Sequence, residues 1–223
     1  MTRAFLFGML FWTVSAFSAL GQDYKAEKID APVAVGQVAP EIAALLNPTG
    51  YKVAKGGQVL CEIWLAKEWP IAGDAKTGPE ILYPLTVGQL IGVAKYARKA
   101  NDFRDQDIPA GAYIIRYAQQ PVDGAHVGTS PTRDFFTLLP ATKDRDPKTL
   151  DYKTLTAISK ETTGTAHPAI LSLQKAADGG EPLSVRQNTE KEWTIVRFVG
   201  KAKQGSAVKD LLIELVVVGK AAE

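Results

Sequence analysis

The chain has 223 residues, of which 46% are hydrophobic and 22% are charged, and its formal net charge is +2. That composition is ordinary for a globular protein, and the length is sufficient for one all-β domain with a sizeable core. The near-neutral balance of charge gives no support for a nucleic-acid partner or for binding to an anionic membrane surface.

The first 21 residues have the three parts of a secretory signal peptide. Arg3 supplies the positive end, residues 4–17 form an apolar stretch, and Ala19-Leu20-Gly21 is a small-residue cleavage site. Because the apolar stretch is short for a spanning helix, we expect cleavage after Gly21 and no stable membrane span afterwards. The expected location of the mature chain is therefore the periplasm or the medium.

Residues 22–48 are expected to form an N-terminal extension, and residues 49–223 a single domain. The extension combines a linker or edge strand with a short helix at 40–48, which has prolines at its start and just beyond its end. Two strands then flank Gly56-Gly57, a pair that tolerates the positive φ of a two-residue hairpin turn. The domain is thus expected to open with a β-hairpin.

Cys61 is the only cysteine, so no internal disulfide can form. Alternation along its strand places the thiol on the same face as Val59, Ile63 and Leu65, toward a core. We therefore interpret Cys61 as a small buried hydrophobic residue and not as a nucleophile.

The remainder of the chain consists of apolar strands separated by turns, with one further helix. Asp151 is the expected N-cap of that helix, and Gly164 its end. The predicted strands are, in chain order, 51–55, 58–66, 85–96, 112–118, 135–139, 169–174, 183–187, 192–199 and 208–218. Because few helices separate these strands, the pattern favours an antiparallel sheet over a parallel α/β sheet. The predicted fold class is all-β: an antiparallel β-sandwich, immunoglobulin-like or jelly-roll-like, with two short helices.

The long polar loop between strands 112–118 and 135–139 is the predicted functional site. Loops longer than about 12 to 15 residues are usually functional or disordered, and this composition is not that of disorder. The predicted ligand-binding residues are its polar side chains: Asp123, His126, Ser130, Arg133 and Asp134. A packed loop closed by Asp123 and Arg133 is the structural alternative.

Three catalytic or metal chemistries find little support in the residue spacing. A divalent metal would need His126 and His167, the only histidines, with a carboxylate, and no short ligand spacing brings them together. We therefore predict no cofactor and keep a divalent metal as the alternative. Blue copper is disfavoured because Cys61 lies far before both histidines. A Ser130 nucleophile is disfavoured because Pro131 removes a backbone N–H that could bind the oxyanion.

The segment PAGAYIIRYAQQPVDGAHVGTSPTRDFFTLLPA, with CEIWLAKE before it and GTAHPAILSL after it, resembles a group of exported bacterial proteins generally left uncharacterised. The PAG-Y strand entry and EWTIVRF also resemble a broader bacterial domain family of unknown function with a small β-sandwich. The resemblances imply an exported β fold. They transfer no functional residue, because neither group carries an agreed activity.

The expected function is that of an exported, non-enzymatic β-sandwich which binds a ligand or an envelope protein through loops at one end. The first alternative is a metal-dependent or hydrolytic enzyme centred on His126. The second is a structural subunit of an envelope complex.

Overall fold

A computed structural model describes residues 24–122, 132–177 and 179–221. Its helices are α1 (Pro40–Ala43) and α2 (Tyr152–Thr163). Its strands are β1 (Tyr24–Ile29), β2 (Gly50–Lys55), β3 (Gln58–Leu65), β4 (Trp69–Pro70), β5 (Leu90–Tyr96), β6 (Ala100–Asn101), β7 (Asp107–Ile108), β8 (Gly111–Gln119), β9 (Asp134–Pro140), β10 (Leu171–Gln174), β11 (Ser184–Asn188), β12 (Trp193–Gln204) and β13 (Ala207–Val218). The described protein is therefore mostly β structure with two short helices, as the sequence predicts.

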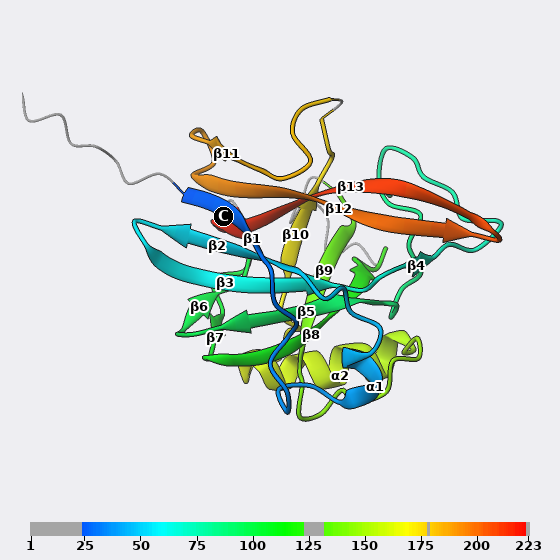
Figure 1. Ribbon diagram of the computed structural model, residues 1–223, viewed down its shortest axis with the longest axis horizontal. Helices are drawn as coiled ribbons and strands as arrows, with labels where there is room; N and C mark the ends of the chain where they lie inside the picture. The colour runs from blue at the N-terminus through cyan, green and yellow to red at the C-terminus, as the bar shows by residue number, and fades with distance from the viewer. Residues whose placement is uncertain (1–23, 123–131, 178, 222–223) are drawn as a thin grey trace, which may run out of the picture.

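One large sheet contains most of the strands. Its order is β1-β2-β3-β5-β8-β9-β10-β13-β12-β11, with every neighbouring pair antiparallel, and β4 pairs with β12 in parallel. The sheet curls, so that β2 lies near β12 and β1 near β11 (Figure 1). The rings of Tyr51 and Phe198 stack across this space with their centroids 5.8 Å apart. The short strands β6 and β7 pair only with each other among the described residues.

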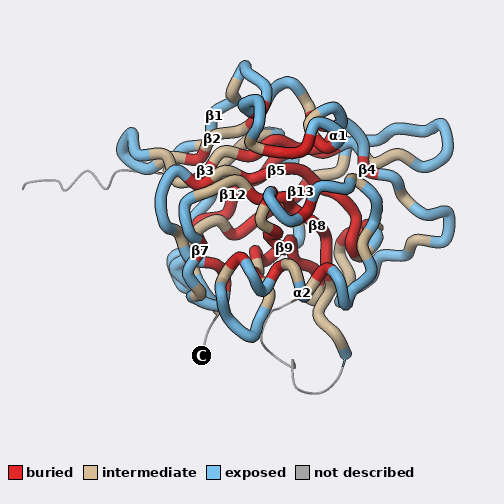
Figure 2. The backbone as a smooth tube through the Cα atoms, turned by 90° about the horizontal axis from the view of Figure 1, so that it is seen from below, coloured by how far each residue is buried: buried red, intermediate tan, exposed pale blue. Residues whose placement is uncertain are grey.

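Two hydrophobic cores lie on opposite faces of the β3–β5–β8 part of the sheet. In β3, Cys61, Ile63 and Leu65 belong to the core inside the curl, whereas Trp64 belongs to the outer core. The outer core is covered by the two helices, which contribute Ile42 and Leu155. Buried residues accordingly lie at the centre of the molecule, and the loops around them are exposed (Figure 2). The predicted alternation of faces in β3 is confirmed from Cys61 to Leu65, but it was wrong at the ends: a bulge opposite Val53 and Ala54 places Leu60 against the core inside the curl, to which Ala66 also belongs.

Local sequence signals correctly located one turn and both ends of α2. Gly56 and Gly57 have φ values of 55° and 81°, the left-handed conformation that the hairpin turn requires. The Asp151 side chain accepts a hydrogen bond from the Thr154 backbone N–H, and Gly164 ends the helix with a φ of 66°. Side-chain capping and glycine's freedom therefore explain where these elements begin and end.

Several predicted boundaries were wrong. The helix predicted at 40–48 is helical only over Pro40–Ala43. The strand predicted at 85–96 begins at Leu90, because Gln89 folds back to accept a hydrogen bond from the Thr86 backbone N–H. The loop predicted from residue 67 contains β4, which exists only through its pairing with β12.

Arg116 of β8 is completely buried, and every N–H of its guanidinium has a partner. Two of these groups bind the Asp144 carboxylate, at 2.6 and 2.8 Å. The other three bind the backbone carbonyls of Gly88, Lys148 and Asp146, at 2.7, 2.8 and 2.6 Å. Arg116 therefore fixes two loops, around residues 88 and 144–148, onto the central strand.

Side chains of alternating charge form a row across β1, β2, β3 and β5, the first four strands in the order of the sheet. Glu27, Lys52, Glu62 and Lys95 occupy paired positions on β1, β2, β3 and β5. Lys52 and Glu27 lie 2.9 Å apart, and Lys95 and Glu62 3.2 Å apart. Such partly exposed pairs contribute little to stability, but they keep this side of the sheet solvated.

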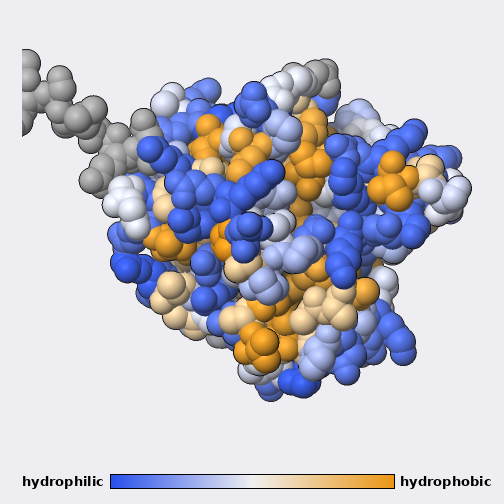
Figure 3. All heavy atoms as spheres, in the orientation of Figure 1, coloured by the Kyte–Doolittle hydropathy of each residue, from blue (hydrophilic) through white to orange (hydrophobic). Residues whose placement is uncertain are grey.

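Hydrophilic side chains occupy much of the periphery of the face in Figure 3, and hydrophobic side chains gather in a strip across its middle. Within residues 24–122, 132–177 and 179–221, no helix has the length and apolar character needed to cross a membrane.

The substitution Asp144→Ala tests the importance of the buried ion pair. It leaves the Arg116 charge buried without its counter-ion, so we expect a loss of about 3–5 kcal/mol in the free energy of unfolding. Urea unfolding followed by tryptophan fluorescence provides the measurement. The control is Glu161→Ala, which breaks an ion pair with Lys143 whose side chains are 50% and 56% exposed and should cost less than about 1 kcal/mol. Equal losses in the two variants would contradict the structural role of Arg116.

Candidate ligand-binding site

The structure describes only the base of the predicted binding loop; Asp123, His126 and Ser130 lie outside the described residues. At the base, the Gln120 N–H donates to the Arg133 carbonyl at 2.9 Å. The Arg133 side chain donates back to the Gln120 carbonyl at 2.9 Å, and its backbone N–H donates to Glu80 at 3.0 Å. Arg133 therefore closes the loop and ties it to a neighbouring segment.

Asp134 is 1% exposed, and its carboxylate is directed into the protein. It accepts hydrogen bonds from the backbone N–H groups of Leu82 and Tyr83, at 2.8 and 3.2 Å, and from the Tyr117 hydroxyl at 2.5 Å. Burial, reinforced by this bond to Asp134, raises the pKa of Tyr117, so the phenol remains a donor. The structure thus places Asp134 as an anchor for residues 82–83.

His167 lies on an exposed turn after α2. Its backbone N–H donates to the Thr165 hydroxyl at 3.1 Å. The next carbonyl, that of Pro168, accepts from the Gln106 side chain at 3.2 Å, so this turn lies beside the segment around residue 106. No group of three or more His, Cys, Asp or Glu side chains suited to a metal occurs in the described part of the chain. Metal binding by His126 and His167 stays the untested alternative, because His126 lies outside the described residues.

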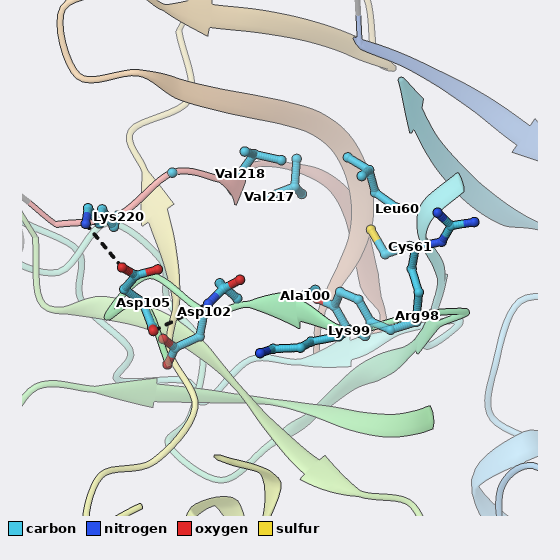
Figure 4. A pocket seen from close by; sticks show the side chains of 13 residues that line it. Leu60, Cys61, Arg98, Lys99, Ala100, Asp102, Asp105, Val217, Val218 and Lys220 are labelled. Atoms are coloured by element: carbon cyan, nitrogen blue, oxygen red, sulfur yellow. Dashed lines mark hydrogen bonds and ion pairs between the residues drawn. The ribbon is translucent and has the colours of Figure 1, made fainter. Parts of the chain in front are cut away.

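A pocket of about 330 Å³ opens at the other end of the sheet, where β3, the β5–β6 turn and the end of β13 meet (Figure 4). Its lining residues are Leu60, Cys61, Tyr96, Arg98, Lys99, Ala100, Asn101, Asp102, Asp105, Val217, Val218, Gly219 and Lys220. Tyr96 pairs with Gly111 at the start of β8, whereas the predicted loop follows Gln119. Eight residues of extended strand separate these two ends by about 26 Å. The pocket and the predicted loop are therefore distinct sites.

One wall of the pocket is apolar. Leu60 and Cys61 from β3 face the same space as Val217 and Val218 from the end of β13 (Figure 4). Tyr96 also lines the pocket; it is 8% exposed and packs edge to face against Tyr113. An apolar surface of this kind, with a few polar groups around it, is typical of small-molecule sites.

The Cys61 thiol lines the pocket but is only 2% exposed. Burial raises the pKa of this thiol to about 12, and the neighbouring charge of Glu62 raises it further in the same direction. Because the thiolate is the reactive form, Cys61 is a neutral and unreactive part of the wall at physiological pH. The interpretation of Cys61 as a buried hydrophobic residue is confirmed.

Asp102 forms part of the opposite side of the pocket, and its carboxylate is fully engaged. It accepts from the backbone N–H groups of Arg104, Gln106 and Ile170, at 2.8, 2.9 and 2.8 Å, and from the Gln106 side chain at 2.8 Å. Burial raises the pKa of Asp102, and these four bonds oppose the shift. The carboxylate shapes the turn at 102–106 and binds it to the start of β10.

Two of the three cationic side chains at the pocket form ion pairs with carboxylates. Lys99 lies 2.7 Å from Asp107, and Lys220 lies 3.1 Å from Asp105. Arg98 is exposed and has no hydrogen-bond or ion-pair partner among the residues that the structure describes. The pocket therefore offers one uncommitted guanidinium.

Sequence reasoning missed this pocket because its walls come from three distant segments. The only local signal is the charged sequence ARKANDFRDQD, which we expected to be a connection between strands. Its density of charge directly after the buried Tyr96 is the feature that could have identified one edge of a site.

A second buried charge cluster, centred on Glu214, holds the far side of the sheet together. Its carboxylate binds Arg186 at 2.5 Å and Arg197 at 2.7 Å. Arg197 also donates to the Ala177 carbonyl at 2.8 Å and to the Gly179 carbonyl. Burial acts to raise the pKa of Glu214, but the hydrogen bonds from the two arginines outweigh it, so the pKa is lowered overall. Its bonds lie within the fold and mark it as structural.

The protonated state of Cys61 predicts slow alkylation. At pH 8 we expect iodoacetamide to modify the native protein at least about 100-fold more slowly than the urea-unfolded protein, because burial suppresses both access and thiolate formation. Mass spectrometry of quenched samples measures the rate, and Cys61→Ser is the blank. Rapid stoichiometric modification of the native protein would contradict a buried neutral thiol.

The lowered pKa of Glu214 predicts a specific acid sensitivity. Since the folded state favours the carboxylate, its contribution is present above the unfolded pKa near 4.5 and is lost as pH falls through the folded pKa. Glu214→Gln should cost roughly 1–3 kcal/mol at pH 7, and the difference from the natural protein should shrink toward pH 3. Urea unfolding at pH 7, 5 and 3 measures this. Glu68→Gln, at a half-exposed pair with Lys203, is the control and should show little change; a Glu214→Gln deficit independent of pH would contradict the linkage.

Comparisons with known proteins give no relative from which a site could be transferred. No protein-family model, curated protein or solved structure matches the chain. The resemblance to exported bacterial proteins therefore stays an expectation, and the pocket is the feature on which a functional hypothesis can rest.

Proposed function

We propose that the protein is an exported, non-enzymatic binding protein that holds a small ligand in the pocket between β3, the β5–β6 turn and the end of β13. The observation that carries the proposal is the pocket itself. Its volume of about 330 Å³ lies in the range of roughly 300–1,000 Å³ found for ligand sites. Its apolar wall with a charged rim suits a ligand that is partly apolar.

The chemical state of the lining residues favours binding over catalysis. The Cys61 thiol is protonated, since its pKa is raised to about 12 by burial. The Asp102 carboxylate is taken up by four N–H donors, and Asp105 is paired with Lys220. A general base needs a free lone pair within hydrogen-bond reach of the proton it removes. Cys61 and Asp102 are thus better suited to forming a wall than to proton or acyl transfer.

We also infer that the curled sheet is a form of antiparallel β-sandwich. Two observations support this: the stacking of Tyr51 of β2 on Phe198 of β12, and the single core that residues from both halves of the sheet share. In such folds the loops cluster at the two ends of the layers, and ligand sites commonly use one of these ends. The position of the pocket, where β3, the β5–β6 turn and the end of β13 meet, supports binding at such an end.

The proposed location rests on the signal-like first 21 residues. An exported protein without a disulfide depends on packing and buried polar contacts for stability. The buried pairs of Arg116 with Asp144 and of Arg197 with Glu214 supply such contacts. This combination is consistent with a stable carrier or receptor for a small molecule outside the cytoplasm.

Filling the pocket tests the proposed function. We expect the neutral fluorophore N-phenyl-1-naphthylamine to bind the mature protein saturably, and Val217→Trp to weaken binding at least tenfold because the larger side chain enters the pocket. Fluorescence titration measures the affinity. The matched control is Val208→Trp, on the same strand but 47% exposed and outside the pocket, which should bind like the natural protein.

Thermal unfolding of both variants shows whether they are folded. If Val217→Trp does not fold, Ala100→Phe fills the pocket from the opposite wall. Absence of saturable binding by the natural protein, or unchanged binding by a folded pocket-filling variant, would refute the proposed function.

A further inference from the structure

Resting on the proposed function, we propose that the ligand is a singly charged anion with an apolar body, and that Arg98 binds its anionic group. The proposal rests on three features: the net charge of the side chains that line the pocket, which of these side chains already have a partner, and the position of Arg98 relative to the apolar wall.

The lining charges do not cancel. Three cations, Arg98, Lys99 and Lys220, face two carboxylates, Asp102 and Asp105. Both carboxylates are engaged: Asp102 by four N–H groups and Asp105 by Lys220. A cationic ligand would have to approach Asp105 beside the Lys220 ammonium, a like charge, and would find the Asp102 carboxylate already bound by four donors, so the pocket disfavours it.

Only one of the cations is without a partner among the described residues. Lys99 is paired with Asp107 just outside the pocket, at 2.7 Å. Arg98 has no hydrogen bond or ion pair to a described residue and therefore retains its five N–H donors. A planar guanidinium binds a carboxylate, sulfate or phosphate through two parallel hydrogen bonds, which a neutral ligand cannot reproduce. One spare guanidinium matches one anionic group.

The arrangement of the pocket requires an apolar body on the same ligand. Arg98 and the Lys220–Asp105 pair lie at opposite ends of the view in Figure 4, with Leu60, Val217 and Val218 along the wall between them. An anion held by Arg98 that extends along the pocket must therefore lie against this apolar wall. Burial of its body removes apolar surface from water and adds affinity in proportion to that surface.

Four ligands with the same eight-carbon chain test the inference by isothermal titration calorimetry with the mature protein. Octanoate and octyl sulfate carry the anion, octan-1-ol is neutral, and octylamine is cationic. We expect at least one anion to bind tenfold or more tightly than octan-1-ol, and octylamine to bind most weakly. Preference for octanoate identifies a carboxylate ligand, and preference for octyl sulfate a sulfate monoester.

In Arg98→Gln, the affinity for the anion should exceed that for octan-1-ol by less than about twofold, while the affinity for octan-1-ol itself should be unchanged. Arg98→Lys should retain part of the advantage, because an ammonium keeps the charge but not the paired hydrogen bonds. The matched control is Arg145→Gln, which makes the same change of charge at an exposed residue that does not line the pocket, and should keep the full advantage.

The possible failures distinguish the two proposals. If octan-1-ol or the neutral fluorophore binds but neither anion is favoured, the pocket is a ligand site and the anionic assignment is wrong. The anionic assignment is also wrong if octylamine binds most tightly or if Arg98→Gln keeps the preference. If neither the fluorophore nor any of the four chains binds, the proposed function fails, and this inference fails with it.

Discussion

The buried guanidinium of Arg116 is the constraint on which the arrangement around the central strand depends. Removing such a charge from water costs several kcal/mol, and this cost is offset only if each donor finds a partner. The five acceptor atoms belong to four residues on two loops, near residue 88 and at 144–148. Both loops must therefore reach β8 together. At Gly88, which has a φ of 84°, a Cβ atom would lie 1.8 Å from the Leu150 carbonyl oxygen, so this contact also requires glycine. Because α2 starts at Tyr152, the same contacts determine where the helix lies on the outer core.

At other edges of the sheet, buried carboxylates attach loops and neighbouring strands through hydrogen bonds. Asp134 holds residues 82–83, Asp102 holds the turn at 104–106 and the start of β10, and Glu214 holds two arginines of neighbouring strands. In each case the oxygens are directed at donors within the protein. Acidic residues that look available for chemistry in the sequence are thus used to attach loops to strands. This explains why polar residues beside a loop, such as Asp134, are poor guides to a site when the sequence alone is read.

The sequence carries the local features of the fold and few of its long-range ones. Alternation from Cys61 to Leu65, the glycines of the β2–β3 turn and the Asp151 cap depend on near neighbours, and all three were predicted correctly. Strand β4 was not, because two residues form a strand only when Trp69 docks against Gly200, where a Cβ atom would lie 1.8 Å from the indole ring. The order of strands in the curled sheet and the pocket depend in the same way on contacts between distant segments. For the predicted loop, length and composition indicated a site, but Arg133 and Asp134 serve at its base as internal contacts.

The pocket is shaped by contacts within the fold. The Asp102 carboxylate accepts a hydrogen bond from the Ile170 backbone N–H. The backbone N–H of the neighbouring Phe103 donates to the Ile170 carbonyl, and the Phe103 carbonyl accepts from the N–H of Ala221, after β13. These contacts hold the polar side of the pocket and the end of β13 in a fixed relation, while β3 supplies the apolar wall from within the core. A preformed site requires little ordering when it binds, so modest contacts can yield useful affinity. The exposed Arg98 is the exception to this rigidity, since no described residue holds its side chain. For the ligand that we propose, a fixed apolar wall beside one unrestrained cation would let shape select the body of the ligand and charge select its end group.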